Sequence, residues 1–246
     1  NSNNINFKNV TFTYQRTGIK VFDSFNLEIE EGKTLGIIGK VGSGKTTLLD
    51  LLSRVYDPEK GSILYNNKDI RSFKINNLRG LFSYVPQNNF LFSDSIYKNI
   101  QFGNPDATNE QVQKAAKLSE IDSEIDKFEK GYRTILGERG ITLSGGQIQR
   151  ISIARSLIKD SALYLFDDCF SSLDTDTEER LINNLKNRLK NKSVVIVSHR
   201  VSCIKHSDKI IVLENGKIIQ QGTHKNLINM DGYYKELYNK QNSEIT

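Results

Sequence analysis

The stretch that decides the fold is Gly39-Lys40-Val41-Gly42-Ser43-Gly44-Lys45-Thr46. It follows the apolar run 35–38 and leads into Thr47-Leu48-Leu49, in the order of a strand, a phosphate-binding loop and a helix. The glycines let the loop turn its backbone N–H groups toward a phosphate chain, Lys45 can reach the terminal phosphates, and the Thr46 hydroxyl can hold Mg²⁺. The positive end of the helix adds to the attraction. The stretch therefore predicts a site for a nucleoside triphosphate.

The composition fits one large α/β domain, or one such domain with a modest insertion, because the chain has 246 residues, 37% hydrophobic and 26% charged. Its 34 Lys and Arg against 29 Asp and Glu give a net charge of +5. These basic residues are scattered, so we expect a solvated surface and no nucleic-acid partner. No apolar run approaches the ~20 residues of a membrane span. Cys169 and Cys203 are interpreted as small apolar residues in a reducing compartment.

Two runs of alternating apolar residues predict half-buried antiparallel strands ahead of the phosphate loop. They are Ile5, Phe7, Val10 and Phe12, then Val21, Phe25, Leu27 and Ile29. Tyr14 follows the first run, and its ring could stack on a purine base or pack in the core. The chain begins with Asn1 and not with Met, so we expect a fragment of a longer protein.

The middle of the chain predicts a helical insertion. Residues 62–65 and 81–85 have the pattern of strands, and the second of these runs into Gln87, which could ligate Mg²⁺ or orient a water molecule. From Ser95 to about Lys130 the apolar residues take helical spacing. We therefore expect a helical subdomain at about residues 88–158, inserted in a single domain that covers residues 1–246.

A second glycine-rich stretch, Leu143-Ser144-Gly145-Gly146-Gln147, comes before a helix with an apolar face. Ser144 is well placed as its N-cap, and two glycines at a helix N-terminus make a potential phosphate site. No lysine follows, so the stretch is not a second phosphate loop of the first kind. Something else must complete this site.

Two further apolar runs predict strands of a parallel sheet that are buried on both faces. Asp167 and Asp168 follow residues 162–166 at the carboxyl end of one strand, where such sheets bind their ligands. An acid there is the usual partner of Mg²⁺ beside a phosphate loop. Residues 194–197 lead to His199, which we place at the same edge, next to the phosphates.

These motifs, in this order, closely resemble the nucleotide-binding domain of ATP-binding cassette (ABC) transporters. The resemblance implies an α/β fold: a P-loop NTPase core with a mainly parallel sheet, an N-terminal antiparallel β-subdomain and a helical insertion. It assigns an adenine platform at Tyr14, the Walker A motif at Gly39–Thr46 with Thr47 next to it, the Q-loop glutamine at Gln87, the signature at Leu143–Gln147, the Walker B motif at Leu163–Asp167, the D-loop at Ser171–Asp174 and the switch histidine at His199.

The resemblance also implies partners. Members bind ATP with Mg²⁺, held here by Thr46, Gln87 and Asp167, and two domains pair head to tail. The signature residues Ser144, Gly145, Gly146 and Gln147 would then bind, in trans, the ATP that the partner's Walker A motif holds. A transmembrane domain is expected N-terminal to residue 1. It would contact this domain near Gln87 and Glu138, at the cytoplasmic face of a membrane.

One departure from the family concerns the water-activating position, which is usually Glu and here is Asp168. Its carboxylate is drawn back by about 1 Å, and a misplacement of that size can cost about 10²-fold in rate. Asp168, His199 and Gln87 are the predicted catalytic residues, and this site is expected to be slow. The pattern resembles the less active half of heterodimeric multidrug-type exporters.

Two alternatives remain open at this point. One is a regulatory module that clamps ATP without hydrolysing it, which only Asp168 favours. The other is a soluble cassette protein of translation or DNA repair. Such proteins carry two cassettes in one chain or a long coiled-coil insertion, and this sequence shows neither.

Overall fold

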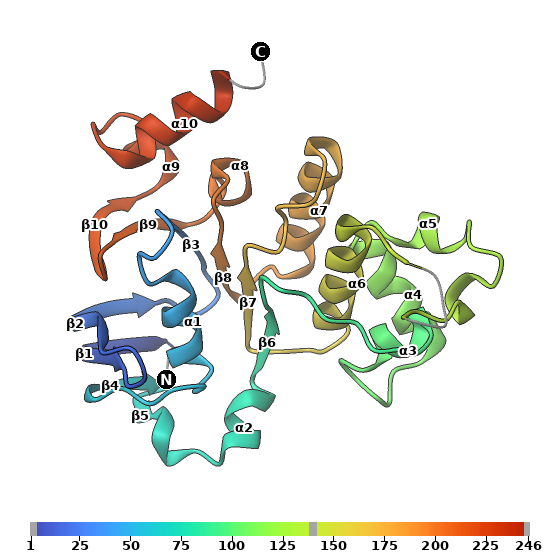
Figure 1. The fold of residues 1–246 in the computed structure, drawn as a ribbon, viewed down its shortest axis with the longest axis horizontal. Coiled ribbons are helices and arrows are strands. Elements are labelled where there is room, and N and C mark those ends of the chain that lie inside the picture. The colour runs from blue at the N-terminus through green and yellow to red at the C-terminus, as the bar shows by residue number, and fades with distance from the viewer. Residues whose placement is uncertain (1–3, 138–141, 244–246) are drawn as a thin grey trace. The chain divides into compact units, whose positions relative to one another are not determined.

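The computed structural model describes residues 4–137 and 142–243, and its chain forms two compact units (Figure 1). The first unit consists of Asn1–Phe82, Ala162–Asp167 and Asn191–Thr246. The second consists of Ser83–Ser161 and Asp168–Lys190. Each unit is therefore assembled from segments that are distant in sequence.

An antiparallel sheet in the first unit contains β1 (Ile5–Tyr14), β2 (Ile19–Ile29), β4 (Lys60–Tyr65) and β5 (Lys68–Asp69). Their order is β2-β1-β4-β5, and each neighbouring pair is antiparallel. Seven of the eight apolar residues that alternate in β1 and β2 are buried, the exception being the half-buried Val21. The predicted N-terminal antiparallel strands are confirmed.

A second sheet of the first unit carries the phosphate loop. Its strands β3 (Thr34–Gly39), β7 (Leu163–Asp167), β8 (Ser193–Val197), β9 (Lys209–Glu214) and β10 (Lys217–Gly222) lie in the order β10-β9-β3-β8-β7. The pairs β9–β3, β3–β8 and β8–β7 are parallel, whereas β9 and β10 form an antiparallel hairpin. Every residue of β7 and β8 is buried, as their continuous apolar sequences predict.

Short helices complete the first unit. They are α1 (Lys45–Leu52), the 3₁₀ turn η1 (Ile70–Ser72), α2 (Ile75–Gly80), α8 (Val201–Ile204), α9 (His224–Leu227) and α10 (Tyr233–Ser243). Helix α1 packs against β3 and β7, and α8 packs against β3 and β8. The sheet edge at which the parallel strands end is therefore bordered by α1 and α8.

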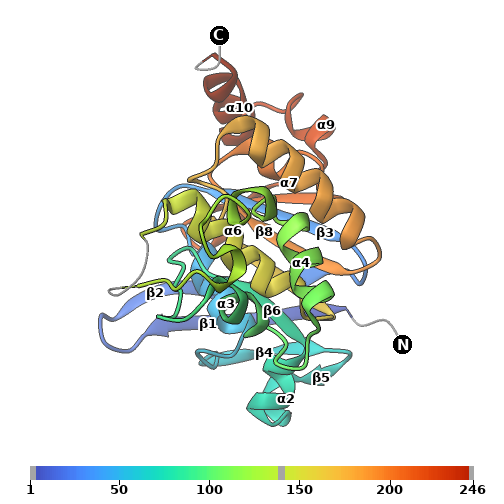
Figure 2. The same ribbon diagram turned by 90° about the vertical axis from the view of Figure 1, so that its right-hand side faces the viewer.

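The second unit is mainly helical (Figure 2). Its elements are α3 (Ile96–Gln101), α4 (Asn109–Leu118), α5 (Asp122–Ile125), the 3₁₀ turn η2 (Gly131–Arg133), α6 (Gly145–Leu157) and α7 (Thr175–Arg188), while β6 (Phe82–Val85) leads into it from the first unit. Its core includes Ile96, Ile100, Val112, Ala116, Ile121, Ile125, Ile151 and Ala154.

Besides the segment expected as a helical insertion at about 88–158, the second unit contains α7. Arg180 and Asn184 of α7 donate hydrogen bonds to the Glu120 carboxylate, at 3.0 and 2.7 Å. These links join α7 to the end of α4. Across residues 4–137 and 142–243, no helix combines the length and the hydrophobicity needed to cross a membrane.

Candidate functional site

The phosphate loop joins β3 to α1, and its conformation requires glycine at several positions. Gly42 and Gly44 have φ angles of 79° and 104°, which side chains disfavour. A Cβ atom on Gly39 would lie 2.1 Å from the carbonyl oxygen of Leu213, and one on Gly44 would lie 2.9 Å from a methyl group of Val21. The predicted loop is therefore a tight backbone turn that neighbouring strands contact closely.

The ammonium group of Lys45 lies inside this loop, and the residue is only 6% exposed. The Nζ atom donates to the carbonyl oxygens of Gly39 and Lys40, both at 2.8 Å, and to Ser43 Oγ at 3.4 Å. A buried ammonium group held by loop carbonyls concentrates positive charge at the start of α1. This arrangement suits a polyphosphate.

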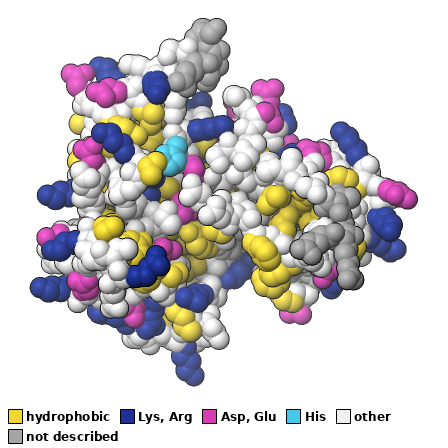
Figure 3. Space-filling model, viewed as in Figure 1, with side chains coloured by type: hydrophobic (Ala, Val, Ile, Leu, Met, Phe, Trp, Pro, Cys, Tyr) yellow, Lys and Arg dark blue, Asp and Glu magenta, His cyan; other side chains and the backbone are white. Residues whose placement is uncertain are grey.

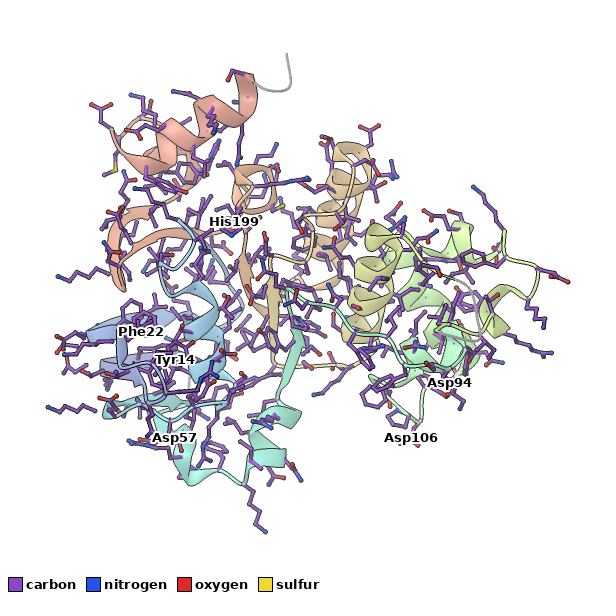
Figure 4. All side chains as sticks on the ribbon, in the orientation of Figure 1. Tyr14, Phe22, Asp57, Asp94, Asp106 and His199 are labelled. Atoms are coloured by element: carbon purple, nitrogen blue, oxygen red, sulfur yellow. The ribbon has the colours of Figure 1, made fainter. Side chains whose placement is uncertain are left out.

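Strand register brings the other predicted residues of the first unit to the same sheet edge. Ile37 pairs with Val197, and Val197 pairs with Asp167. Gly39 and His199 each follow two residues after this row, so the phosphate loop and the histidine loop leave the sheet side by side. Figure 4 shows His199 just after β8. The parallel sheet thus delivers a phosphate loop, an acid and a histidine at one edge.

Thr46 and Asp167 supply oxygen atoms of the kind that Mg²⁺ prefers, one hydroxyl and one carboxylate. Thr46 is exposed, whereas Asp167 is 2% exposed. Burial raises the pKa of Asp50 on α1, and the charge of Asp167 raises it further. In the part of the chain that the structure describes, no three His, Cys, Asp or Glu side chains gather into a metal-binding cluster. A few protein oxygens together with substrate phosphates are the usual Mg²⁺ ligands, so these residues fit the ion.

Tyr14 is half-buried beside the phosphate loop, and its hydroxyl makes a 2.8 Å hydrogen bond with Thr47 Oγ1. The rings of Phe12 and Tyr56 meet it at T-shaped angles of 79° and 89°. Burial, the largest influence, raises the pKa of the Tyr14 hydroxyl. Tyr14 is therefore anchored to the helix that follows the loop, and Tyr56 is an aromatic neighbour that the sequence interpretation missed.

The signature stretch lies in the second unit, where Ser144 caps α6 as predicted. Ser144 Oγ accepts from the Gln147 amide N–H at 3.3 Å, and Gln147 Oε1 accepts from the Ser144 amide N–H at 2.9 Å. This is a capping box. Gln147 Nε2 also donates to Glu124 Oε2 at 2.8 Å. The Gln147 side chain thus holds the start of α6, and two residues without side chains of their own, Gly145 and Gly146, supply the first helical amides.

Asp168 begins the second segment of this unit. It adopts a φ of 45°, in the left-handed region that Asp tolerates better than most residues, and it is 8% exposed. Gln87 Nε2 donates to Asp168 Oδ2 at 3.5 Å, and Ser171 Oγ donates to the Asp168 carbonyl oxygen at 3.2 Å. Gln87 and Asp168, two of the three predicted catalytic residues, are therefore brought together, while His199 belongs to the first unit.

Several supporting residues could not be found from the sequence. Gln149 Nε2 donates to Ser171 Oγ at 3.2 Å, and Gln149 Oε1 accepts from the Ser172 amide at 3.0 Å, so the helix after the signature holds the predicted D-loop. Arg150 forms a 2.6 Å ion pair with Glu124. These partners are separated by more than twenty residues, and no local pattern pairs them. Glu138, predicted to face a membrane domain, lies outside the described residues.

A glycine-rich loop between a strand and a helix, with an acid at the end of another parallel strand of the same sheet, defines a P-loop nucleoside triphosphatase. A family model described as ABC transporter matches residues 22–171. The chain therefore belongs to the ABC transporter family, and it corresponds to the ATPase domain of such proteins.

Named relatives and a solved structure agree. The chain is 42% identical over 241 residues to the ATP-dependent lipid A-core flippase of Hahella chejuensis, covering 98% of this chain and 41% of the relative. It is 39% identical over 235 residues to a probable multidrug resistance ABC transporter ATP-binding/permease protein of Bacillus subtilis, covering 96% and 40%. A bacterial Atm1-family ABC exporter with ATP bound matches with a TM-score of 0.93 at 38% identity, covering 98% of this chain and 42% of that chain. The chain spans less than half the length of these relatives.

Proposed function

We propose that this chain is the motor domain of an ABC exporter. It binds ATP with Mg²⁺, pairs head to tail with a second nucleotide-binding domain around two ATP molecules, and uses hydrolysis to power export of a small molecule, lipid or peptide across a membrane. The names of the flippase and multidrug relatives support export. One observation carries the proposal. The chain has a phosphate loop in the first unit, and in the second unit it has a helix, α6, that begins with two glycines but is not followed by a phosphate-binding lysine.

The start of α6 supports the dimer. Ser144 and Gly145 are exposed, and the 13-residue helix α6 begins there. A helix N-terminus attracts anions through its unpaired amides and its dipole. Because the capping box already satisfies the third amide, the glycine amides suit a phosphate that another molecule brings. ATP held by a partner's Walker A motif has that chemistry.

At the phosphate loop, Lys45 and the loop amides would hold the phosphates. Thr46, Asp167 and Gln87 would hold Mg²⁺, which when bound neutralises charge that develops on the phosphates. Residues 39–44 and Thr47 would form the remaining phosphate contacts, and Tyr14 would lie against the adenine. Asp168, kept beside Gln87, would orient the attacking water, and His199 would contact the terminal phosphate.

Asp168 supports a slow site and, with it, a heterodimer whose second domain carries Glu at the matching position. General-base assistance is worth about 10²- to 10⁴-fold, so a retracted carboxylate slows the site without abolishing turnover. The same residue favours the second candidate function, a regulatory module that binds ATP without hydrolysing it. Turnover at this site distinguishes the two.

The second unit also offers a surface for a membrane partner. Phe90, Phe92 and Phe102 are 67%, 37% and 60% exposed, and Phe92 and Phe102 line a surface pocket of about 580 Å³ with Asp94 and Lys98. Figure 3 shows hydrophobic side chains on the surface of this part of the molecule. Exposed aromatic patches mark protein interfaces. We assign this one to a transmembrane domain, with the chain at the cytoplasmic face of the membrane and no role for nucleic acid.

Two measurements test the proposal. Light scattering should detect dimers when this domain is mixed with ATP and a second nucleotide-binding domain that has Glu at the position of Asp168. Monomers under all such conditions would contradict the head-to-tail arrangement. The gene should also encode about six hydrophobic segments of ~20 residues before Asn1, and a start codon at that point would contradict the exporter assignment.

A further inference from the structure

We propose that Gln241, on the C-terminal helix α10, is a positioning residue for His199. Its side-chain amide bonds the backbone on both sides of the histidine loop: Nε2 donates to the His199 carbonyl oxygen at 2.7 Å, and Oε1 accepts from the Val201 amide at 2.8 Å. The inference rests on the role given to His199 in the proposed function. It adds an element that no sequence motif of the site includes.

The hydrogen bonds to Gln241 belong to a set that holds the short loop at residues 198–200, between β8 and α8. On the upstream side, the Ser198 amide donates to the Ile37 carbonyl oxygen of β3 at 3.1 Å. Ser198 Oγ then accepts from the Arg200 amide at 3.0 Å. Downstream, the loop leads into α8, which has only four residues. The loop is therefore hydrogen-bonded to β3 through Ser198 and to Gln241 through His199 and Val201.

The opposite end of α10 contacts the phosphate loop. The Lys40 ammonium lies 5.9 Å from the ring centroid of Tyr233, the first residue of the helix, and pairs with Glu214 Oε1 at 3.1 Å. Tyr233 and Gln241 are eight positions apart, which corresponds to about 12 Å along the helix. Helix α10 thus contacts both the phosphate loop, through Tyr233, and the loop that contains His199, through Gln241. Figure 1 shows α10 near α8, and the two helices are in contact.

The expected consequence of losing Gln241 is a fall in kcat with little change in nucleotide affinity. A displacement of about 1 Å at a reacting group can cost about 10²-fold in rate. Lys45, which would bind the phosphates, donates hydrogen bonds to two carbonyl oxygens of the phosphate loop, and neither of them belongs to the histidine loop. Removing the bonds of Gln241 therefore moves His199 without disturbing the main phosphate contacts.

The experiment uses the full-length protein with a partner domain whose own catalytic Glu is replaced by Gln, so that the measured kcat and KM for MgATP belong to the site of this chain. The thermal midpoint is measured on the same samples. Gln241→Leu removes both hydrogen bonds at similar volume, and Gln241→Asn shortens the amide by one methylene. Asn239→Leu, at an exposed position of the same helix, is the control. We expect each Gln241 variant to lower kcat about tenfold or more, with KM within about twofold and the control unchanged.

His199→Ala separates this inference from the proposed function. In its background, Gln241→Leu should lower kcat by less than about twofold, because residues that act through one another are not additive. An equal loss in both backgrounds would overturn the inference, and so would a Gln241 variant as active as Asn239→Leu while His199→Ala is impaired. If His199→Ala itself keeps full activity, the role proposed for His199 fails instead.

Discussion

Gln87 Nε2 lies 3.5 Å from Asp168 Oδ2, although the two residues are 81 positions apart in sequence. The amide of Gln87 thereby contacts the carboxylate that replaces the usual glutamate of the family. Asp168 is the residue on which the prediction of a slow site rests.

We expect Asp168→Glu to raise turnover at this site about 10- to 100-fold, because the longer side chain returns the carboxylate by about 1 Å. Single-turnover hydrolysis measures this when the partner domain's own catalytic Glu is replaced by Gln, and Asp168→Asn should fall below the wild type. The φ of 45° favours Asp over Glu, so the Glu variant should melt slightly earlier. A Glu variant no faster than the wild type would show that the carboxylate position does not limit turnover.

Lys45→Ala should abolish tight ATP binding, since it removes the ammonium group held at the centre of the loop. Fluorescent nucleotide titration gives the Kd directly. Lys33→Ala is the matched control, because Lys33 is exposed before the same strand and pairs with Asp208 at 3.6 Å. Wild-type affinity in Lys45→Ala would count against the loop as the nucleotide site.

Ser144→Arg should leave ATP binding to the isolated domain nearly intact while blocking dimerisation with ATP. The arginine removes the N-cap, which costs about 1 kcal/mol, and places a large side chain at the exposed start of α6. Titration and light scattering on the same sample compare the two properties. If both fall equally, the signature serves the nucleotide of its own chain.

Two substitutions of Tyr14 separate stacking from anchoring. Tyr14→Phe keeps the ring and loses the hydrogen bond with Thr47, so it should retain the preference for ATP over GTP. Tyr14→Ala removes the ring and should weaken that preference. Competition between the two nucleotides measures the ratio, and an unchanged ratio in Tyr14→Ala would leave the residue as ordinary packing.

Glu124 links the signature helix to α5 and should make stability depend on pH. Burial, the largest influence, raises its pKa, but hydrogen bonds from Arg150 and Gln147 outweigh it, so the folded-state pKa is lowered. A lowered pKa contributes stability above the ordinary value of about 4.3, and this stability disappears as pH falls through the folded pKa.

Glu124→Gln should therefore destabilise the protein at pH 7 by about 1.5–3 kcal/mol, the range for hydrogen bonds to charged groups. The difference should vanish at a pH below the folded pKa of Glu124. Urea unfolding at pH 7 and at acidic pH measures both values. If the stability difference between the two proteins persists unchanged in acid, the negative charge of Glu124 is not its source.

The elements nearest to a motif were the most predictable. The phosphate loop, the apolar strand before Asp167 and the capped start of α6 were identified because their residues act through local backbone geometry. The end of the helical insertion was less accessible, since α7 joins the second unit through Glu120, a contact between segments about sixty residues apart. Gln241 was not identified at all, because an isolated glutamine near a chain end matches no pattern.

The sequence by itself determined the chemistry: glycines that permit the loop, a lysine and a threonine after them, an acid after a buried strand, and an aspartate where the family has glutamate. These follow from spacing along the chain, which local sterics and hydrophobic periodicity translate into structure. Tertiary structure decided which side chains support that chemistry. Thr47 holds Tyr14, Glu124 holds Gln147, and Gln241 holds the loop of His199. Such pairings depend on how distant segments pack, and spacing along the chain does not encode them.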